Sequence, residues 1–394
     1  MNQREIALNI ISKTISDDSY TNLLMRKKLE ELEPIQRPFV TNLVNNVLKN
    51  YDLLLFQVNG LIDNKTSLKN KIIITMALYE KFYLKEKDYV ITNEYVNLAK
   101  NKFDKAFINA ILRKEIDFKY SENESINNSL PSWIYNLLKS QYENNELNEI
   151  LNNYKRVPDV YYRLNKSKAN FEMFDNIEII DDSIFRSNKN LINSKEMNEG
   201  LFYIQDYNSS CLYKNLDLVC DDILLDVCCA PGSKLFNCLD IIKPNNAYAN
   251  DLHKHRVELI KQKAEVLGYY GINYLNYDGC VLKDVLNTKF SKIILDAPCS
   301  GLGTLGRRPD LKFHIKPESL DQLQSIQEKL LDSIKNLLLD NGILLYSTCT
   351  LNKKENRKQI DKFLLNNKNF KLLDDKTIIN QKGDCFYYAK LMKW

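Results

Sequence analysis

Residues 223–234 read Ile223-Leu224-Leu225-Asp226-Val227-Cys228-Cys229-Ala230-Pro231-Gly232-Ser233-Lys234. The apolar run at the start predicts a buried strand, and the spacing of apolar residues from Leu235 to Ile241 predicts a helix directly after it. Small residues in the turn let the backbone approach a ligand closely, and a helix start offers unpaired N–H groups. Taken alone, the unit fits nucleotide binding and an ordinary connection equally well, so the residues after the later strands must decide between them.

Strand-like and helix-like segments alternate from Gly200 to the end of the chain. Short apolar runs predict strands over residues 223–227, 247–250, 272–275, 292–295, 343–346, 370–373 and 385–391, and helical spacing predicts helices over 257–267, 319–338 and 355–365. Repeated strand–helix units build a mostly parallel, doubly wound sheet that binds ligands at the carboxyl ends of its strands. We therefore predict an α/β domain over residues 200–394.

Glycine marks the main boundary of the chain. Ten of the eleven glycines lie at or after Gly200, and the first 199 residues contain only Gly60. A region that is poor in glycine and rich in Leu, Lys and Glu favours helices, so we predict an all-helical bundle over residues 1–116. Apolar residues recur there at helical spacing, as in the stripe Phe39, Leu43, Val44, Val47 and Leu48. Further helices are predicted over 53–58, 72–83, 94–100 and 107–112. Residues 117–199 predict a connecting α+β subdomain, with an exposed linker over Glu122–Asn128.

Composition narrows the class of protein. A chain of 394 residues with 44% apolar and 27% charged residues is expected to be soluble and to form two or three domains. It has no apolar run long enough to span a membrane, and its start is polar. Nine cysteines without regular spacing and only three histidines predict a reducing compartment and no metal site. We expect a cytoplasmic monomer whose net charge of +4 permits a nucleic-acid partner without requiring one.

Polar or reactive side chains follow each predicted parallel strand. They are Asp226 after the first strand, Asn250-Asp251 after the second, Asp278 after the third, Asp296-Ala297-Pro298-Cys299-Ser300-Gly301 after the fourth and Ser347-Thr348-Cys349-Thr350 after the fifth. A carboxylate after the second strand is well placed to bind a ribose, although acidic residues after strands more often are solvated or cap the next helix. A lone free cysteine is usually a small buried apolar residue. Two cysteines at the ends of adjacent central strands instead predict a reactive site.

These motifs resemble, in order and spacing, those of the S-adenosyl-L-methionine-dependent RNA cytosine-C5 methyltransferases of the Nol1/Nop2/Sun family. The resemblance rests on residues 226–234, 296–301 and 347–350, on the segment from Gly200 to Asp206 and on the segment from Arg308 to Phe313. Within that family the pattern is similar to that of the Sun-type bacterial 16S ribosomal RNA methyltransferases. It implies a Rossmann-like methyltransferase domain, with ribosomal RNA as the partner.

The helical part resembles the NusB-like RNA-binding domain. Residues 39–44, 77–83 and 93–96 carry this resemblance, and its most specific part is Phe107-Ile108-Asn109-Ala110-Ile111-Leu112-Arg113. Together the two resemblances cover essentially the whole chain. Contact between the helical domain and RNA is implied by the resemblance, not by composition.

The resemblance also implies a covalent route to 5-methylcytosine. Cytosine C5 is a weak nucleophile, and addition of a thiolate at C6 makes it enamine-like. In the family's pattern Cys349 is the attacking thiol, Asp296 hydrogen-bonds the cytosine ring at N3, and Cys299 helps to remove the C5 proton. A competing assignment makes Cys299 the attacker, as in DNA cytosine methyltransferases. The pair Thr348-Cys349 favours the RNA arrangement.

The family pattern implies cofactor and RNA contacts as well. Cys228, Cys229, Ala230, Pro231, Gly232, Ser233 and Lys234 would wrap the methionine and ribose portions of S-adenosyl-L-methionine, with Asp251 at the ribose, Asp278 at the adenine and Asp296 bordering the cofactor. The chain departs from the pattern at Ser233 and Leu235, where glycine and threonine are usual. Arg163, Arg307 and Arg308 are candidate RNA contacts, with a solvated basic surface as the alternative.

Two other functions stay open. One is the same chemistry on transfer RNA or large-subunit ribosomal RNA. The other is a non-enzymatic RNA-binding assembly factor whose catalytic site has decayed. The presence of Asp296, Cys299 and Cys349 argues against decay.

Overall fold

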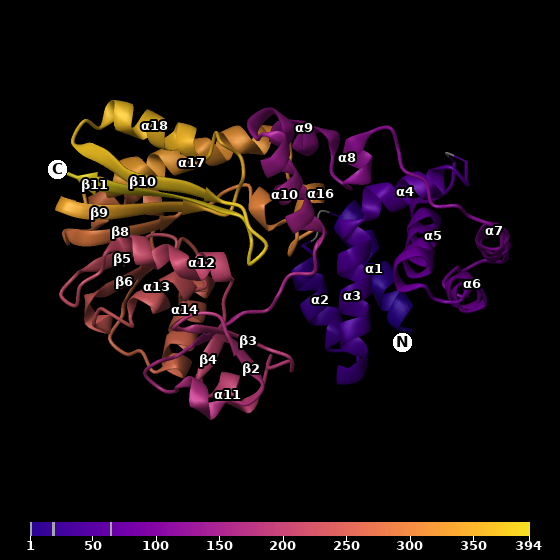
Figure 1. Ribbon diagram of the computed structural model, residues 1–394, viewed down its shortest axis with the longest axis horizontal. Coiled ribbons are helices and arrows are strands. Elements are labelled where there is room, and N and C mark those ends of the chain that lie inside the picture. The colour runs from indigo at the N-terminus through magenta and orange to yellow at the C-terminus, as the bar shows by residue number, and fades with distance from the viewer. Residues whose placement is uncertain (1, 18–19, 64) are drawn as a thin grey trace. The chain divides into compact units, whose positions relative to one another are not determined.

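The computed structural model describes residues 2–17, 20–63 and 65–394 (Figure 1). Its contacts divide the chain into two compact units, residues 1–147 with 305–315 and residues 148–304 with 316–394. The first unit is helical, and the second contains the two β-sheets of the described chain. The predicted division into three parts at residues 116 and 199 stays a prediction.

The helices of the first unit pack around one apolar core. They are α1 (Gln3–Ser16), α2 (Thr21–Leu29), α3 (Arg37–Lys49), α4 (Tyr51–Asn59), α5 (Leu68–Tyr79), α6 (Asp88–Val96), α7 (Lys102–Leu112), α8 (Glu124–Asn127) and α9 (Ser132–Gln141), while α10 (Asn144–Lys155) crosses into the second unit. The stripe predicted on α3 is buried at Leu43, Val44, Val47 and Leu48. The predicted all-helical bundle is therefore confirmed.

Two local predictions in this unit are wrong. The helix predicted over residues 94–100 is α6, which begins at Asp88, where an acidic side chain complements the helix dipole, and ends at Val96. The linker predicted over Glu122–Asn128 contains the helix α8, whose Asn123 cap accepts a hydrogen bond from Ser125 N. The Ser129 hydroxyl after this helix accepts a hydrogen bond from Leu53 N over 3.0 Å, and this bond holds the segment against α4.

A small antiparallel sheet lies near the start of the second unit. Its strands are β1 (Tyr162–Leu164), β2 (Ile177–Ile179), β3 (Ile184–Ser187) and β4 (Phe202–Ile204) in the order β2–β3–β1–β4, and the short helix α11 (Lys195–Asn198) precedes β4. Tyr162, Phe185 and Phe202 are buried together, with ring centroids 5.4 Å apart in each pair. Short strands, one helix and an aromatic core make this the predicted α+β part.

The larger sheet has seven strands in the order β10–β11–β9–β8–β5–β6–β7. They are β5 (Leu224–Asp226), β6 (Ala247–Asn250), β7 (Asn273–Leu275), β8 (Phe290–Asp296), β9 (Leu338–Thr348), β10 (Phe370–Ile378) and β11 (Phe386–Lys393). The pairs from β7 to β9 are parallel, whereas β11 runs antiparallel to both β9 and β10. The predicted mostly parallel sheet is confirmed. The carboxyl ends of its five parallel strands share one edge.

Helices cover both faces of this sheet (Figure 1). Successive strand residues point to opposite faces, so Leu224 and Leu225 join different core clusters. One face carries α13 (Ser233–Cys238) and α14 (Lys254–Leu267), with α12 (Tyr207–Cys211) nearby; the other carries α15 (Leu282–Val285), α17 (Pro317–Ile334) and α18 (Arg357–Asn366). This doubly wound arrangement is Rossmann-like.

Residues 305–315, which include α16 (Leu311–His314), pack into the helical unit although they come after β8 in the chain. The buried Lys312 Nζ donates to Asp52 Oδ2 over 3.0 Å and to Ser129 O over 2.5 Å. The ring of Phe313 meets that of Tyr51 edge-on at 5.6 Å. Because these partners lie on α4 and just after α8, the segment belongs to the packing of the helical unit.

Candidate active site

The two cysteines in the loops after β8 and β9 lie side by side. Their Sγ atoms are 3.4 Å apart. Strands β8 and β9 pair with Asp296 opposite Ser347, and Ala297 N donates to Ser347 O over 2.8 Å. Because the two strands end level with each other, the loops after them bring Cys299 against Cys349.

A close backbone approach supports the Cys349 loop. Gly303 N donates to Cys349 O over 2.9 Å, and Cys385 N donates to Gly303 O over 2.9 Å. A Cβ atom at position 303 would lie 2.2 Å from Cys385 O and 2.8 Å from Cys349 O. Only glycine fits there, and its fit joins the loops after β8 and β9 to the segment that leads into β11.

An ion pair links the turn after β5 to the end of β8. Lys234 Nζ, in the first turn of α13, donates to Asp296 Oδ2 over 2.6 Å, and Ser347 Oγ donates to Asp296 Oδ1 over 2.8 Å. Burial lowers the pKa of Lys234, but the charges of Asp296 and Asp226 outweigh burial and the net pKa is raised. Lys234 is therefore a cation, and it fixes the orientation of the Asp296 carboxylate.

The Cys299 thiol is held in its protonated form. Its hydrogen bond with Cys349 raises its pKa most strongly, and burial and the charges of Glu355 and Asp296 raise it further. A thiolate, not a thiol, is the nucleophilic form of cysteine. The environment of Cys299 therefore disfavours it as the attacking sulfur in the resting enzyme.

The turn after β5 is tight and is fixed through its backbone. Gly232 has φ +96°, a conformation that glycine adopts readily, and a Cβ atom there would lie 2.6 Å from the Phe236 ring. Cys229 N donates to Asn250 O over 2.8 Å, and Gly232 N donates to Cys229 O over 2.7 Å. Helix α13 begins at Ser233, so the departure from the family pattern at this position does not prevent the helix start.

Asp226 supplies an unpaired polar atom beside this turn. Its side chain is buried, and its Oδ1 atom has no hydrogen-bond partner. Burial, followed by the charge of Asp296, raises the pKa of Asp226 to about 7. Burial and the same carboxylates also raise the pKa of the Cys228 thiol. A tight turn with an orphaned buried oxygen fits a polar ligand, so the residues present suit a bound cofactor.

The carboxylates of Asp251 and Asp278 accept hydrogen bonds from nearby backbone N–H groups. Asp251 Oδ2 accepts a hydrogen bond from Ala230 N over 3.3 Å, and its Oδ1 accepts one from His253 N over 3.1 Å. Asp278 Oδ1 accepts one from Cys280 N over 2.9 Å, at the start of a 3-10 turn. Carboxylates accept several hydrogen bonds each, so these local contacts leave capacity for a ligand. The predicted ribose and adenine contacts stay predictions.

Asn250 organises the same edge of the sheet. Its Nδ2 atom donates to Val227 O over 2.9 Å and to Tyr277 O over 3.1 Å, and its Oδ1 atom accepts from Tyr277 N over 3.0 Å. It thus joins the segments after β5, β6 and β7. The sequence singled out Asn250 only as the neighbour of Asp251. Its hydrogen bonds to the segments after three strands can be recognised only once those strand ends are known to be adjacent.

Sequence reasoning missed Glu355 altogether. Its side chain is fully buried just before α18 and accepts hydrogen bonds from both cysteine loops. In the sequence it stands in the polar run Asn352-Lys353-Lys354-Glu355-Asn356, which reads as an exposed helix start. No sequence signal sets it apart from its neighbours.

The structure buries Arg163, which the sequence offers as an RNA contact, and its contact with RNA stays a prediction. Its side chain is 2% exposed and its guanidinium donates to Asp240 Oδ2 over 2.7 Å. It also lies over the Tyr213 ring, 5.1 Å from the centroid. Burial lowers the pKa of Arg163, but Tyr203, Tyr213 and Asp240 outweigh burial and raise it overall. Arg163 is a structural cation of the second unit.

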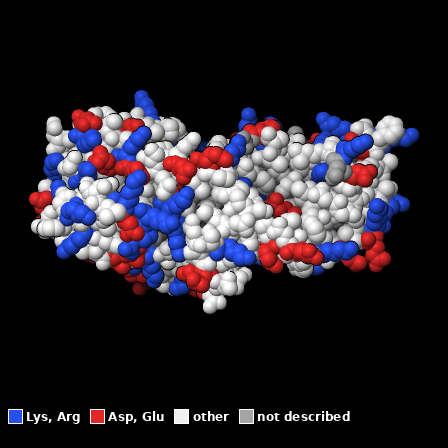
Figure 2. Space-filling view, turned by 90° about the horizontal axis from the view of Figure 1, so that it is seen from above, with Lys and Arg blue, Asp and Glu red and all other residues white. Residues whose placement is uncertain are grey.

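Arg307 and Arg308 lie in the segment that packs into the helical unit, and both are half-buried. Their predicted contact with RNA stays a prediction. Figure 2 shows Lys and Arg side chains gathered on part of the second unit, with Asp and Glu among them. Surface ion pairs of the second unit include Arg357–Asp361 and Lys283–Asp332.

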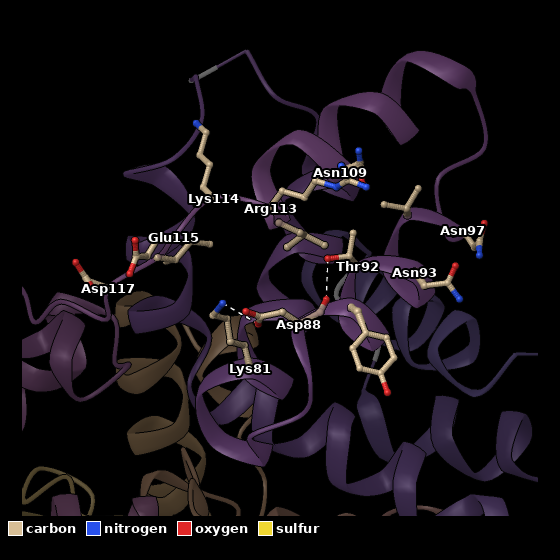
Figure 3. Close-up of a pocket in the computed structure, with 14 residues that line it drawn as sticks. Lys81, Asp88, Thr92, Asn93, Asn97, Asn109, Arg113, Lys114, Glu115 and Asp117 are labelled. Carbon is tan, nitrogen blue, oxygen red and sulfur yellow. Dashed lines mark hydrogen bonds and ion pairs between the residues drawn. The ribbon is translucent and has the colours of Figure 1, made fainter.

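A polar hollow of about 830 Å³ opens on the helical unit (Figure 3). Asn93 of α6, Asn109 of α7 and Arg113 line it, and Lys81 Nζ pairs with Asp88 Oδ1 at 2.8 Å on its wall. These residues include parts of the segments with NusB resemblance. The cysteines and Asp296 do not line the hollow, so it is separate from the candidate active site.

The described chain contains neither a membrane-spanning helix nor a metal cluster. None of its helices has the length and apolar character needed to cross a bilayer. No group of three or more His, Cys, Asp or Glu side chains in residues 2–17, 20–63 and 65–394 could hold a metal ion.

Comparison with known protein families gives one match at each end of the chain. Residues 213–392 match the family described as 16S rRNA methyltransferase RsmB/F, and residues 1–117 match the NusB family. Residues 213–392 are thus similar to an RsmB/F methyltransferase domain. The residues matched to the RsmB/F family contain the turn of residues 228–234, Asp296 and both cysteines, and the NusB match ends one residue from the predicted boundary. The cofactor of an RsmB/F domain is S-adenosyl-L-methionine.

Individual relatives agree with this RsmB/F assignment. The "Probable ribosomal RNA small subunit methyltransferase B" of Bacillus subtilis (strain 168) is 29% identical and aligns over 93% of this chain and 89% of its own length. The crystal structure of PH0851 has a TM-score of 0.79 at 20% identity, covering 100% of this chain and 99% of that one. NSun6 from Pyrococcus horikoshii with SFG has a TM-score of 0.59 at 18% identity, covering 67% and 98%. The two structures support the fold.

Proposed function

We propose that this protein forms 5-methylcytosine in 16S ribosomal RNA, at the cytosine 967 type of position, through a covalent bond between Cys349 and the base. The observation that carries the proposal is the 3.4 Å separation of the Cys299 and Cys349 sulfurs next to the strand that ends in Asp296. The family description and the name of the Bacillus subtilis relative support small-subunit ribosomal RNA as the substrate.

Cys349 is the sulfur that attacks C6 of the cytosine. Attack needs a thiolate, and the Cys299 thiol can donate a hydrogen bond to a thiolate on Cys349 across 3.4 Å. Lys234 adds a positive charge that interacts with Cys349. Formation of the Sγ–C6 bond uses the sulfur lone pair and leaves C5 enamine-like.

Asp296 holds the base during this step. Its carboxylate is anchored by Lys234 and Ser347, and it accepts a hydrogen bond from the ring at N3 once N3 takes a proton from solvent in the Cys349 adduct. The target base must leave its stack or lie in an unpaired loop to reach these groups. S-adenosyl-L-methionine, held at the turn of residues 228–234 with Asp251 and Asp278, supplies the electrophilic methyl group when it is bound.

Cys299 completes the cycle as a base. The largest cause of its raised pKa is the hydrogen bond with Cys349. Once the Cys349 sulfur is bonded to carbon it carries no charge and is a weaker hydrogen-bond acceptor, so Cys299 loses its proton to solvent more easily. Cys299 then removes the C5 proton, the electron pair reforms the C5–C6 double bond, and the Sγ–C6 bond breaks. Cys349 leaves as a thiolate.

The experiment is a methyl-transfer assay combined with RNA mapping. Purified protein, labelled S-adenosyl-L-methionine and either naked 16S ribosomal RNA or partial small-subunit particles are combined, and modified cytosines are mapped by bisulfite sequencing. RNA from cells that lack the protein is mapped in parallel. We expect one 16S cytosine to lose its modification in those cells and to gain it in the assay.

Two other outcomes of the methyl-transfer assay would support the alternative functions. Transfer to tRNA or 23S ribosomal RNA alone would assign the same chemistry to another substrate. No transfer in a single turnover would indicate an RNA-binding factor with a decayed site. We propose further that the protein acts as a cytoplasmic monomer, which gel filtration and fractionation of cells would test.

A further inference from the structure

The buried carboxylate of Glu355 joins the loops that carry the two cysteines. It accepts hydrogen bonds from Ser300 N over 2.9 Å and from Ser300 Oγ over 2.6 Å, in the residue directly after Cys299. It also accepts one from Asn352 Nδ2 over 3.1 Å, in the loop that begins at Cys349. One side chain with 0% exposure therefore anchors both loops.

Further bonds hold the same group in place. Gln327 Nε2, on α17, donates to Glu355 Oε2 over 3.1 Å and to Pro298 O over 3.0 Å. Tyr346 OH, on β9, donates to the backbone oxygen of Glu355 over 2.7 Å. Ser300 Oγ and Thr350 Oγ1 lie 2.7 Å apart and tie the two loops together directly. The network reaches a helix, a strand and both loops.

The network requires a carboxylate. The four contacts come from one backbone N–H, one hydroxyl and two amide groups, each donating to Glu355. A carboxylate offers two acceptor oxygens, whereas a glutamine offers one oxygen and an NH₂ group that donates. Glutamine at this position would set donors against donors in a buried space, where unpaired polar groups are costly.

The negative charge of Glu355 also affects the pKa of the Cys299 thiol. After the hydrogen bond with Cys349, burial and the charge of Cys349, the negative charge of Glu355 is the next cause that raises the pKa of the Cys299 thiol. A second anion beside a buried carboxylate is unfavourable.

We propose that Glu355 is a positioning residue for methyl transfer: its carboxylate holds the Cys299 and Cys349 loops in register, so that the two sulfurs stay in contact and the base meets both. The consequence for turnover rests on the function proposed above. The consequence for the two thiols does not, because their reactivity is measured on the free protein.

The first measurement is alkylation of Cys299 by iodoacetamide across a pH series, followed by peptide mass spectrometry on the full chain. In Glu355→Gln we expect Cys299 at pH 7.5 to react about ten-fold faster than in the wild type, because the charge that disfavours its thiolate is gone. Glu328→Gln is the matched control, since Glu328 is a partly exposed glutamate on α17 that pairs with Lys362. We expect the control to show the wild-type pH profile.

The second measurement separates kcat from KM for methyl transfer to RNA. Misplaced sulfurs slow the chemical step without removing the RNA surface, so in Glu355→Gln we expect kcat to fall about a hundred-fold while KM stays within about three-fold. Glu355→Asp keeps the charge on a shorter side chain. It is expected to restore the Cys299 alkylation profile but not the full kcat.

The outcomes are distinct. An unchanged Cys299 profile in Glu355→Gln, or a kcat that falls with no change at either thiol, would overturn the proposal. If Glu355→Gln does not fold, Ser300→Ala takes its place, since it removes one hydroxyl donor and keeps the Ser300 N bond to Glu355. Because Ser300→Ala keeps the charge of Glu355 and loosens only the loop, a wild-type kcat in this variant would likewise overturn the proposal. If the wild type methylates no RNA, the proposed function fails while the alkylation result still decides the role of Glu355.

Discussion

Cys299 Sγ lies 3.4 Å from Cys349 Sγ, across the gap between two neighbouring parallel strands. At this distance a carbon bonded to one sulfur is within reach of the other. One cysteine can therefore hold a pyrimidine while the second exchanges a proton with it. This contact is what the proposed function requires if the two cysteines have separate roles.

Exchanging each cysteine separates their roles. Cys349→Ala is expected to abolish the covalent RNA adduct, because burial and the charges of Glu355 and Asp296 still disfavour a thiolate on the remaining Cys299. Cys299→Ala is expected to accumulate the adduct, because the C5 proton is not removed. Denaturing gels of enzyme incubated with RNA and S-adenosyl-L-methionine read out both. An adduct that survives Cys349→Ala and disappears in Cys299→Ala would reverse the assignment.

Removing the Lys234 ammonium is expected to slow methyl transfer and to destabilise the domain. In Lys234→Met the Asp296 carboxylate loses its cation and its fixed orientation, and loss of one partner of a buried pair costs about 3 kcal/mol. Because Asp296 is about a third exposed, we expect roughly 2 kcal/mol. Urea unfolding and single-turnover rates measure the two effects. Lys261→Met, on the exposed face of α14, is the control, and equal losses in both variants would contradict the assigned role.

Asp226 makes stability depend on pH. Its pKa is about 7 in the folded chain and near 3.8 when unperturbed. Between these values the unfolded chain has lost the proton and the folded chain still holds it, so stability falls as pH rises through this window. Asp226→Asn does not titrate. Its stability relative to the wild type should rise by at most roughly 4 kcal/mol between pH 4 and pH 8.

Thermal or urea unfolding at several pH values tests this dependence. The exposed Asp284→Asn serves as the control, and its difference from the wild type should stay constant across the series. A constant difference for Asp226→Asn as well would show that the Asp226 carboxyl does not hold its proton in the folded chain.

Substitution of Arg163 should lower the free energy of unfolding and leave KM for RNA unchanged. Arg163→Met leaves Asp240 largely buried without its cation, and we expect a loss of about 3 kcal/mol in the free energy of unfolding. KM for RNA should match the wild type at a temperature where both are folded. Arg186→Met, which removes a half-exposed arginine paired with Glu178, is the control for stability. A raised KM in Arg163→Met with unchanged stability would support the RNA contact.

Gly303 should not tolerate a methyl group. Gly303→Ala places Cβ 2.2 Å from Cys385 O and 2.8 Å from Cys349 O, and both are backbone atoms that cannot swing aside. We expect displacement of Cys349 and loss of about a hundred-fold in kcat. Gly60→Ala is the matched control, since the nearest atom there is 3.4 Å away. Wild-type kcat in Gly303→Ala would show that the loop relaxes freely.

Much of the architecture was predictable because it is local. Alternating strand and helix signals predicted the seven-stranded sheet, and the scarcity of glycine predicted the bundle; both are confirmed. Candidate residues after the parallel strands were predictable for the same reason, since strand ends meet at one edge whatever their sequence distance. The prediction of an exposed linker over residues 122–128 is wrong, because a short polar sequence looks the same whether the segment is solvated or packed against the protein.

The sequence alone determined the periodicity, the turn chemistry and which residue types stand after each strand, since these depend on neighbours along the chain. Only the tertiary structure decided that Arg163 is buried against Asp240 and that residues 305–315 pack with the helical unit. It also decided that Glu355 binds both cysteine loops. The physical reason is that burial and hydrogen-bond partners depend on residues far away in the chain. The sequence around a charged side chain does not indicate which residue will pair with it.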